Sequence, residues 1–348
     1  MLKRTLNLMK QDSKVALRNY FHLVILILAV LMSLLINFAI PDEVKLTPTE
    51  LFFDNTPGKA FQEYLISEGV DPDRFFNSYE DLKSAVRKDG SSLGIAVEGE
   101  LDRARVTIIH QGTESEEILN LLDATIESAL DRVRGIERES NHRVEYLRSK
   151  SAPVSFNKNT IPIIVFMEAI MLGFLLISVM VFQEKEEGSI RAYRVSPGGT
   201  LEYILSKAAV NMGLGVIYAT LLVVLTMGFR VNFPALMVLV ALSSFFITML
   251  GLAVSAFFRS LQEFLFVGVF ILSILSFPVG SYYSPAFSPD IVTWLPSYPI
   301  LFGVREILFP TGKTGFITSL NLLLIAESLG MLLFSYLVVH RRLMREGR

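Results

Sequence analysis

The sequence predicts a mainly α-helical membrane protein, with six transmembrane helices and an α/β extracytoplasmic domain between helices 1 and 2. Its composition is the first reason, since 51% of the 348 residues are apolar, more than in a typical soluble domain. The second reason is that these residues form long runs, interrupted by a single polar block. The net charge of −2 gives no indication of a nucleic-acid partner, and the absence of cysteine excludes disulfides and Cys-ligated metal sites.

Six apolar runs are long enough to cross a bilayer, which takes about 20 mostly apolar residues in a helix. They lie at 20–40, 161–182, 204–229, 235–257, 264–281 and 317–339. These runs divide the chain into a cytoplasmic N-terminal helix (1–19), transmembrane helix 1 (20–40), an extracytoplasmic domain (41–160), transmembrane helices 2–6 (161–340) and a cytoplasmic tail (341–348).

The orientation follows from lysine and arginine, which collect in the cytoplasmic flanks of membrane spans. They are frequent before the first run, after the second and after the sixth, whereas short loops on the opposite side hold only Arg230, Arg305 and Lys313. We therefore expect both termini in the cytoplasm and the plasma or inner membrane as the location.

Residues 1–19 combine apolar and basic side chains before the first span. This pattern fits an amphipathic helix on the inner leaflet, and a basic flank that only fixes the topology is an equal alternative. The first run is too long for a cleavable signal peptide and has no small-residue cleavage site after it, so we interpret it as an uncleaved anchor.

The polar block alternates predicted strands and helices, which is typical of a small sheet covered by helices. We predict strands at 50–55, 93–99 and 104–112, and helices at 57–69, 78–90 and 114–147. Gly69 and Gly90 suit the C-caps of the first two helices. The third helix carries one apolar stripe, formed by Ile118, Leu119, Leu122, Ile126, Leu130 and Val133.

No pattern indicates an enzyme, a metal site or a nucleotide site in this chain. The histidines lack metal-ligand spacing; they are His22, His110, His142 and His340. The sequence Gly312-Lys313-Thr314 is not a phosphate-binding loop, because Ile307 and Leu308 stand where such a loop needs glycine. We expect no cofactor on this chain.

The segment 181–207, VFQEKEEGSIRAYRVSPGGTLEYILSK, lies between the second and third spans. Gly188 can end one helix and Pro197 cannot continue the next, so we expect a short rigid helix of about eight residues between them. Its charges suit a polar interface with a soluble partner. A solvated loop whose charges only fix the topology is the alternative.

This segment resembles the signature of the type-2 ABC export permeases, the ABC-2 type transmembrane subunits. In that family the second span ends in an acidic-basic-acidic cluster with Gly and Ser or Thr, followed by a short helix, a Ser-Pro or Thr-Pro, and a lysine at the foot of the third span. The matching residues are Glu184, Lys185, Glu186, Gly188, Ser189, Ser196, Pro197, Glu202 and Lys207. Arg194, where an apolar residue is usual, and Gly198-Gly199 depart from the pattern. The layout of one span, a large external domain and five spans is also similar, in particular to the drug-export branch.

The resemblance implies that residues 184–197 form a coupling helix that docks on a separate ATP-binding subunit. Two such subunits would bind the ATP, and a second permease copy would complete a homodimer or heterodimer. The implied function is that of the permease subunit of an ATP-driven exporter, with a hydrophobic small molecule, drug or lipid-like compound as substrate. A membrane-anchored sensor or scaffold with an external ligand-binding domain is one alternative, and a secondary transporter is another.

The connection 282–316 is rich in proline and aromatic residues yet too apolar for an ordinary loop. Apolar stretches shorter than a span indicate interfacial or re-entrant helices. The resemblance implies two short re-entrant helices here, and an interfacial lid is the alternative. Tyr282, Tyr283, Trp294 and Tyr298 suit the headgroup level of the bilayer.

Among the polar residues inside predicted spans, we single out Glu168, Asn211 and Glu327. Ionisable residues within a membrane are costly and often functional. Our hypothesis is that these residues line a translocation path, with Glu168 and Glu327 facing it between two protomers. The alternative is that they bond to neighbouring helices or lie near water.

Overall fold

The computed structural model describes residues 2–42, 49–89, 92–110, 112, 116–136, 154–284, 287–312 and 315–345. Its contacts divide the chain into two compact units. The helical unit comprises Met1–Glu43 and Ser151–Arg348, and the sheet unit comprises Val44–Lys150. The sheet unit falls within the block 41–160 that the sequence assigns to the α/β domain.

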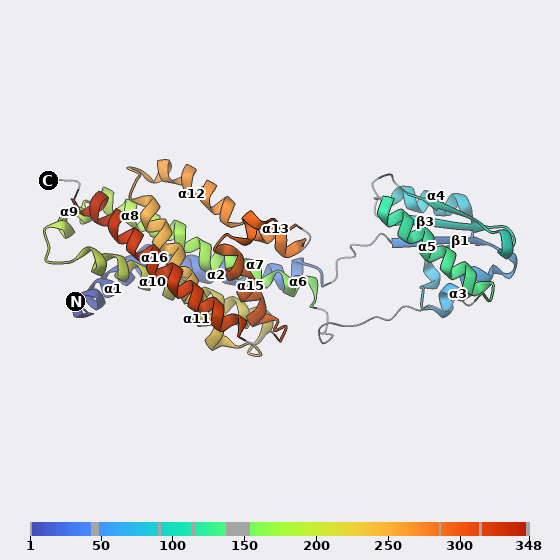
Figure 1. Cartoon of the computed structure of the whole chain (residues 1–348), viewed down its shortest axis with the longest axis horizontal. Coiled ribbons are helices and arrows are strands. Elements are labelled where there is room, and N and C mark those ends of the chain that lie inside the picture. Colours follow the sequence, from blue (N-terminus) through green and yellow to red (C-terminus); the bar gives the residue numbers. More distant parts are fainter. Residues whose placement is uncertain are drawn as a thin grey trace. The chain divides into compact units, whose positions relative to one another are not determined.

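In the described part of the chain, six helical segments are long and apolar enough to cross a membrane, in agreement with the six predicted spans (Figure 1). They are Phe21–Ala39, Phe156–Glu186, Thr200–Met227, Phe233–Ser255, Leu261–Tyr283 and Phe316–Arg345. The second segment begins before the predicted residue 161, because two short helices that contain Asn157, Lys158 and Pro162 lead into it. Their polar residues hide this start from a hydropathy pattern.

Several of these segments combine more than one helical element. The first consists of α2 (Phe21–Leu34) and the π-helix η1 (Leu35–Ala39), and the second of α6 (Phe156–Asn159), α7 (Ile161–Ile164), the π-helix η5 (Val165–Met171) and α8 (Leu172–Glu186). The others are α10 (Thr200–Met227), α11 (Phe233–Ser255), α12 (Leu261–Leu275) with α13 (Pro278–Tyr283), and α16 (Phe316–Val339) with the π-helix η6 (His340–Arg345).

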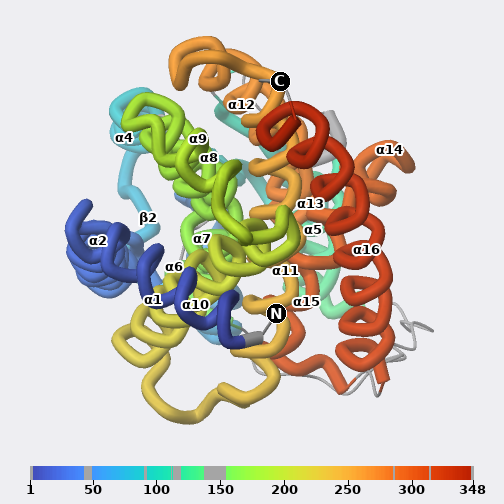
Figure 2. The backbone as a smooth tube through the Cα atoms, turned by 90° about the vertical axis from the view of Figure 1, so that its left-hand side faces the viewer, coloured from blue at the N-terminus to red at the C-terminus, as the bar shows by residue number. Residues whose placement is uncertain are grey.

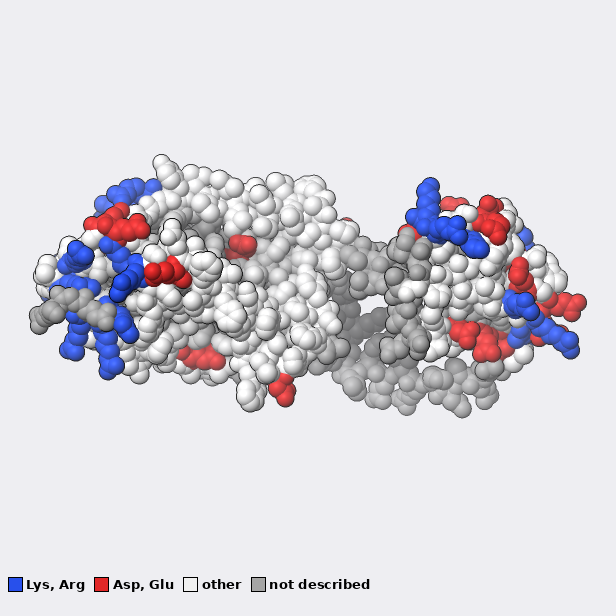
Figure 3. Space-filling view, turned by 90° about the horizontal axis from the view of Figure 1, so that it is seen from above, with Lys and Arg blue, Asp and Glu red and all other residues white. Residues whose placement is uncertain are grey.

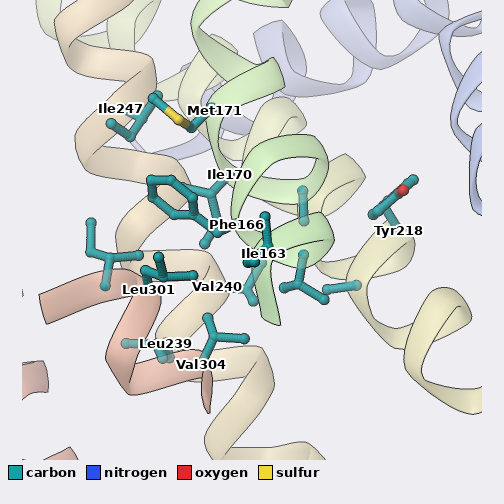
Figure 4. Packing of buried hydrophobic residues seen from close by; sticks show 14 of the residues in the cluster. Ile163, Phe166, Ile170, Met171, Tyr218, Leu239, Val240, Ile247, Leu301 and Val304 are labelled. Carbon is teal, nitrogen blue, oxygen red and sulfur yellow. The ribbon is translucent and has the colours of Figure 1, made fainter. Parts of the chain in front are cut away.

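The second and fourth spans form the centre of the helical unit. In each, 61% of the most apolar 18-residue window is buried, against 22% in the first and sixth spans. Seen from the end where both termini lie, α2 and α12 are on the outside of the unit (Figure 2). Phe166, Ile170, Val240 and Ile247 belong to the central cluster (Figure 4).

Close approach of α8 and α11 depends on a glycine. A Cβ atom added to Gly251 would lie 2.8 Å from both the Phe174 carbonyl oxygen and the Ile177 side chain. Small residues at such crossings let membrane helices pack backbone to backbone. The close packing of α8 and α11 therefore requires glycine at position 251.

The N-terminal segment is the helix α1 (Leu2–Arg18). Asp12 and Ala16 are buried, and α1 packs against α10. Tyr20, with φ of 60°, separates α1 from α2. Contact of α1 with the inner leaflet stays a prediction.

The connection after α12 contains helices of unequal length. α14 (Asp290–Thr293) is a single turn, and the neighbouring Ile291 and Trp294 side chains are exposed. α15 (Ser297–Leu308) has 12 residues and buries Ile300, Leu301 and Val304 in the central cluster. The re-entrant prediction therefore corresponds to one exposed turn and one packed helix.

The described residues of the sheet unit form four strands in the order β2-β1-β3-β4. They are β1 (Thr49–Asn55), β2 (Phe75–Phe76), β3 (Ser92–Glu98) and β4 (Arg105–Ile109). β1 pairs in parallel with β2 and β3, whereas β3 and β4 are antiparallel, with Ile95 opposite Ile108. The three predicted strands are confirmed, and β2 was missed because two residues carry no periodicity.

Helices cover both faces of this sheet. α3 (Ala60–Ser67) and α5 (Glu116–Val133) pack on one face through Phe61, Leu122, Ile126 and Leu130. α4 (Tyr79–Lys88) packs on the other through Leu82 and Val86. Short 3₁₀ turns complete the unit at Pro57–Lys59, Pro72–Arg74 and Leu101–Arg103.

The third predicted helix of this unit ends earlier than expected. α5 stops at Val133, because Gly135 adopts φ of 73° and the N–H groups of Gly135 and Ile136 donate to the Arg132 and Asp131 carbonyls. This is the hydrogen-bond pattern of a glycine C-cap. Gly69 ends α3 in the same way, as predicted, whereas Gly90 and residues 137–147 lie outside the described residues.

Candidate functional site

The loop between α8 and α10 holds one short helix between two turns. α8 ends at Glu186, and Gly188 follows with φ of 73°, a left-handed conformation that glycine adopts without strain. The helix α9 spans Ser189–Arg194, and Pro197 lies in the turn after it. The structure thus divides the predicted coupling segment 184–197 between the end of α8, α9 and two turns.

Hydrogen bonds define the turn between α9 and α10. The Glu202 carboxylate accepts from the backbone N–H of Gly199 at 3.0 Å, and the Tyr193 hydroxyl donates to the Gly199 carbonyl at 3.0 Å. Burial, together with the nearby charges of Glu202 and Asp12, raises the pKa of Tyr193 to about 12. The phenol therefore stays a neutral hydrogen-bond donor near neutral pH. The Ser196 hydroxyl donates to the Tyr193 carbonyl at 2.7 Å.

A buried charged network lies directly behind this loop. Lys207 is only 1% exposed, and its Nζ is 2.5 Å from Glu184 Oε1 and 3.3 Å from Asp12 Oδ1. The second oxygen of Glu184 accepts from the Tyr203 hydroxyl at 2.7 Å, and the second oxygen of Asp12 accepts from the Ser206 hydroxyl. The network joins α1, α8 and α10, and it uses every oxygen of both carboxylates.

Lys185 points in a different direction from its neighbour Glu184. Its ammonium donates to the carbonyls of Ser255 at 2.9 Å and Phe258 at 2.7 Å, at the C-terminal end of α11, and it lies over the Phe182 ring. A cation at a helix C-terminus satisfies carbonyls that have no partner within the helix. Lys185 therefore joins α8 to α11.

Two arginines hold the loop from its sides. Arg194 donates from Nε to the Leu343 carbonyl at 2.6 Å, which links α9 to η6. Arg4 donates from Nη1 to the Pro197 carbonyl at 2.9 Å, which links the second turn to α1. Arg194 is one of the departures from the family pattern, and this bond gives it a structural role.

The outer surface of the loop is open. Val195 is 88% exposed and therefore offers an apolar contact on a mostly polar segment. The exposed residues of the loop are Glu186, Glu187, Ser189, Arg191, Ala192, Val195, Ser196, Pro197 and Gly199. We call this surface the outer face of the loop.

The residues selected from the sequence thus fall into two groups. Glu184, Lys185 and Lys207 point into the protein and hold the loop, whereas Glu186, Ser189, Ser196 and Pro197 lie on the outer face. Sequence reasoning missed Asp12 and Tyr203 as members of the network. A signal for the first was present, because Asp12 is the only acidic residue in the basic helix α1.

A second polar site lies inside the membrane-spanning part of the helical unit. Glu168, Asn211 and Tyr218 line one cavity between η5, α8, α10 and α2, together with apolar residues such as Ile25. The cavity is small, about 10 Å³, and therefore accommodates about one water-sized group. Two of the three polar residues predicted for a translocation path, Glu168 and Asn211, are thus brought together.

The polar atoms of this cavity are incompletely paired. Asn211 and Tyr218 are 3% and 1% exposed, and in the described residues neither end of the amide nor the phenol has a hydrogen-bond partner. Glu168 lies in the π-helix η5, a distortion that is frequent at functional sites. Tyr218 was missed from the sequence because a tyrosine in an apolar run gives no distinct signal.

Glu327 does not line this cavity. It lies half-buried on α16, and its Oε2 atom has no hydrogen-bond partner within the described residues. The three polar residues predicted for one path therefore occupy two different places in the helical unit. No group of three His, Asp or Glu side chains in the described residues could hold a metal ion.

Comparison with protein-family models gives a match over most of the chain. The family described as ABC-2 family transporter protein matches residues 20–339. The match includes the first five membrane segments, the sixth as far as Val339, the sheet unit and the loop between α8 and α10. A comparison with curated proteins gives no match.

Proposed function

Because the chain belongs to the ABC-2 family of transporter proteins, we propose that it is the permease subunit of an ATP-driven exporter, coupled to a separate ATP-binding subunit. One observation supports this coupling above the others. The loop between α8 and α10 presents an open outer face, while a buried charged network fixes its inner side to three helices. Such a loop can receive a force without deforming and pass it to the spans.

The proposed orientation places this loop in the cytoplasm. Lys and Arg gather at the end of the helical unit where α1, α9 and both termini lie, and the flank of that unit is largely free of charge (Figures 1 and 3). Basic residues mark the cytoplasmic side of membrane spans. The protein would then lie in the plasma or inner membrane. Both of its termini would be cytoplasmic, and residues 41–160 would be extracytoplasmic.

The outer face would dock on the ATP-binding subunit. Its exposed Val195 can enter an apolar pocket, while Glu186 and Arg191 provide charges of both signs for specificity. Two ATP-binding subunits and a second permease copy, identical or related, would complete the transporter. ATP would bind to those subunits, so this chain would carry no cofactor and perform no hydrolysis itself.

The buried network would transmit the movement. A push on α9 would reach the network through the Tyr193 ring, whose centroid lies 5.5 Å from that of the Tyr203 ring. Tyr203 donates to Glu184 of α8, and Lys207 of α10 joins Glu184 to Asp12 of α1. Rigid displacement of packed helices is a common form of conformational change in proteins. The cavity of Glu168, Asn211 and Tyr218 borders two of these helices, α8 and α10, so it would change with them.

This cavity is the proposed polar part of the translocation path, together with Glu327 on α16. Its mixture of apolar walls and a few polar groups suits a hydrophobic small molecule, a drug or a lipid-like compound. In the present state it is too small for such a substrate. Transport would therefore require α8 and α10 to separate, and the unpaired polar groups would become available to the substrate.

Co-purification with the ATP-binding subunit from a neighbouring reading frame tests this proposal. We expect Val195→Asp and Arg191→Glu to reduce recovery of the subunit about tenfold or more, as losses at interface hot spots do. Arg230→Glu, an exposed arginine in the α10–α11 connection, is the matched charge control and should bind normally. Equal recovery with all variants would contradict docking at the outer face.

A transport assay separates the alternatives. Export should stop when the ATP-binding subunit carries an inactive nucleotide site, with this chain unchanged. Export that continues and follows an ion gradient would instead establish a secondary transporter. A chain that binds external ligands but moves none under any condition would support the sensor or scaffold.

A further inference from the structure

The basic end of α16 carries a pocket that the proposed transport cycle does not use. It measures about 350 Å³ and is lined by Phe257, Phe334, Leu337, Val338, Arg341 and Arg342. Four of these residues are apolar, two are cationic, and none is acidic. Phe257, Phe334 and Leu337 are each 45–53% exposed, so the pocket opens to the surroundings of the helical unit.

The apolar and cationic parts of the pocket follow one another along a single helical face. Phe334, Leu337, Val338 and Arg341 have the spacing i, i+3, i+4, i+7, which places them on one side of α16 and η6. On the other side, Val339 and Leu343 are buried in a core cluster. The segment therefore packs with one face and leaves an apolar row that ends in arginine on the other.

Two arginines bring positive charge to the pocket. Arg341 and Arg342 are both exposed, and the Arg342 guanidinium lies 5.4 Å from the centroid of the Phe257 ring. Stacking on an aromatic ring holds a guanidinium in place while leaving its N–H groups at the edge. Guanidinium groups bind phosphate through paired hydrogen bonds.

We propose that this pocket binds an anionic phospholipid of the surrounding bilayer. An acyl chain would lie along Phe334, Leu337 and Val338, and the phosphate would accept hydrogen bonds from Arg341, with the positive charge of Arg342 beside it. Basic pockets between membrane helices favour anionic headgroups, and a neutral lipid lacks the net charge that the arginines attract. Free phosphate has the charge but no chain for the apolar row.

The site is placed to influence the loop between α8 and α10. The Leu343 carbonyl, next to Arg342 in the chain, accepts the Arg194 hydrogen bond from α9. His340 Nδ1 lies 2.9 Å from the Thr200 hydroxyl at the start of α10. A lipid that fixes η6 would thereby fix the loop. This regulatory part rests on the proposed function, whereas lipid binding itself does not.

Thermal unfolding of the full chain in detergent tests the binding step. Phosphatidylglycerol is titrated against phosphatidylcholine with the same acyl chains and against inorganic phosphate. We expect only phosphatidylglycerol to raise Tm in a saturable way. Arg341→Gln should weaken the apparent affinity about fivefold and the double change Arg341→Gln/Arg342→Gln about 30-fold, since each arginine near an anionic membrane surface contributes about 1 kcal/mol.

Control variants keep the outcome decisive. Arg345→Gln removes an exposed arginine outside the pocket and should leave the titration unchanged. Leu337→Trp keeps both arginines but fills the apolar row, so it should also weaken binding if the double variant proves unstable. Equal shifts with phosphatidylcholine, equal shifts with phosphate alone, or an equal loss in Arg345→Gln would each overturn the proposal.

Discussion

The helical unit contains two groups of buried polar side chains that differ in how completely they are paired. Around Lys207, both oxygens of Asp12 and both oxygens of Glu184 have partners. Around Glu168, the Asn211 amide and the Tyr218 phenol have none among the described residues. An unpaired buried polar group costs about 1–3 kcal/mol. We interpret the first group as holding α1, α8 and α10 in one arrangement. We interpret the second group as retaining hydrogen-bonding capacity for another state of the protein or for a ligand.

Removal of the shared cation should have the largest effect. Lys207→Met leaves the buried Asp12 and the partly buried Glu184 without their counter-charge, and breaking a buried pair in this way costs about 3–5 kcal/mol. Thermal unfolding in detergent should show a large fall in Tm. The triple variant Asp12→Asn/Glu184→Gln/Lys207→Met should recover most of it, because no isolated charge remains. If Lys207→Met were as stable as the wild type, the network would not be needed for stability.

One substitution made in both groups compares them directly. Tyr203→Phe removes the donor to Glu184 and should cost about 1.5–3 kcal/mol, the usual contribution of a hydrogen bond to a charged group. Tyr218→Phe removes a hydroxyl with no partner in the described residues, so it should leave stability unchanged or slightly higher. Similar losses of stability in the two variants would contradict the proposed difference in hydrogen bonding between the two groups.

Replacement of the unpaired amide separates stability from transport. Asn211→Leu has similar volume and should raise the free energy of unfolding by up to about 1–3 kcal/mol, because the cost of burying the amide disappears. The same variant should export less in vesicles at matched protein amount. Glu168→Gln keeps a polar lining and serves as the control for charge. Normal export by both variants would remove the cavity from the proposed path.

A smaller effect on stability is expected at alkaline pH from Tyr193, which lies beside the network. The pKa of Tyr193 is raised to about 12, so the folded state retains a proton that the unfolded state releases near pH 10. Stability from this group is complete below pH 10 and is lost as pH rises toward 12. Tyr193→Phe should reduce this part of the pH dependence in thermal unfolding curves. An unchanged curve would show that other groups cause the alkaline loss.

The fold was predictable where a local pattern carries the information. Six apolar runs, the alternation of strands and helices in the sheet unit, and Gly69 as a C-cap all agree with the structure. The end of α5 was not predictable, because the amphipathic pattern does not indicate that the helix ends before Gly135. A glycine inside an amphipathic pattern can be tolerated or can end the helix, and only the hydrogen bonds decide.

The sites were predictable residue by residue, but not as sets. Glu184 and Lys207 stand out from a motif, yet their partner Asp12 is 195 residues from Lys207 in the chain. Glu168 and Asn211 each stand out as polar groups in apolar runs, and only packing of η5 against α10 brings them into one cavity. Such convergence depends on helix rotation, which a single sequence leaves undetermined.

The π-helix η5 has a consequence for length changes in the second span. A π-helix contains about one residue more per turn than an α-helix, so it acts as a single inserted residue that both flanks tolerate. Ile163 before it and Phe174 after it both face the core. Deleting one residue between Val165 and Met171 would return this turn to the α-helical count and leave Ile163 and Phe174 both facing the core, whereas a deletion within α8 would turn the helix beyond it by about 100°. The second span should therefore tolerate the loss of one residue at η5 but not in α8, where it would turn the buried face away from the core.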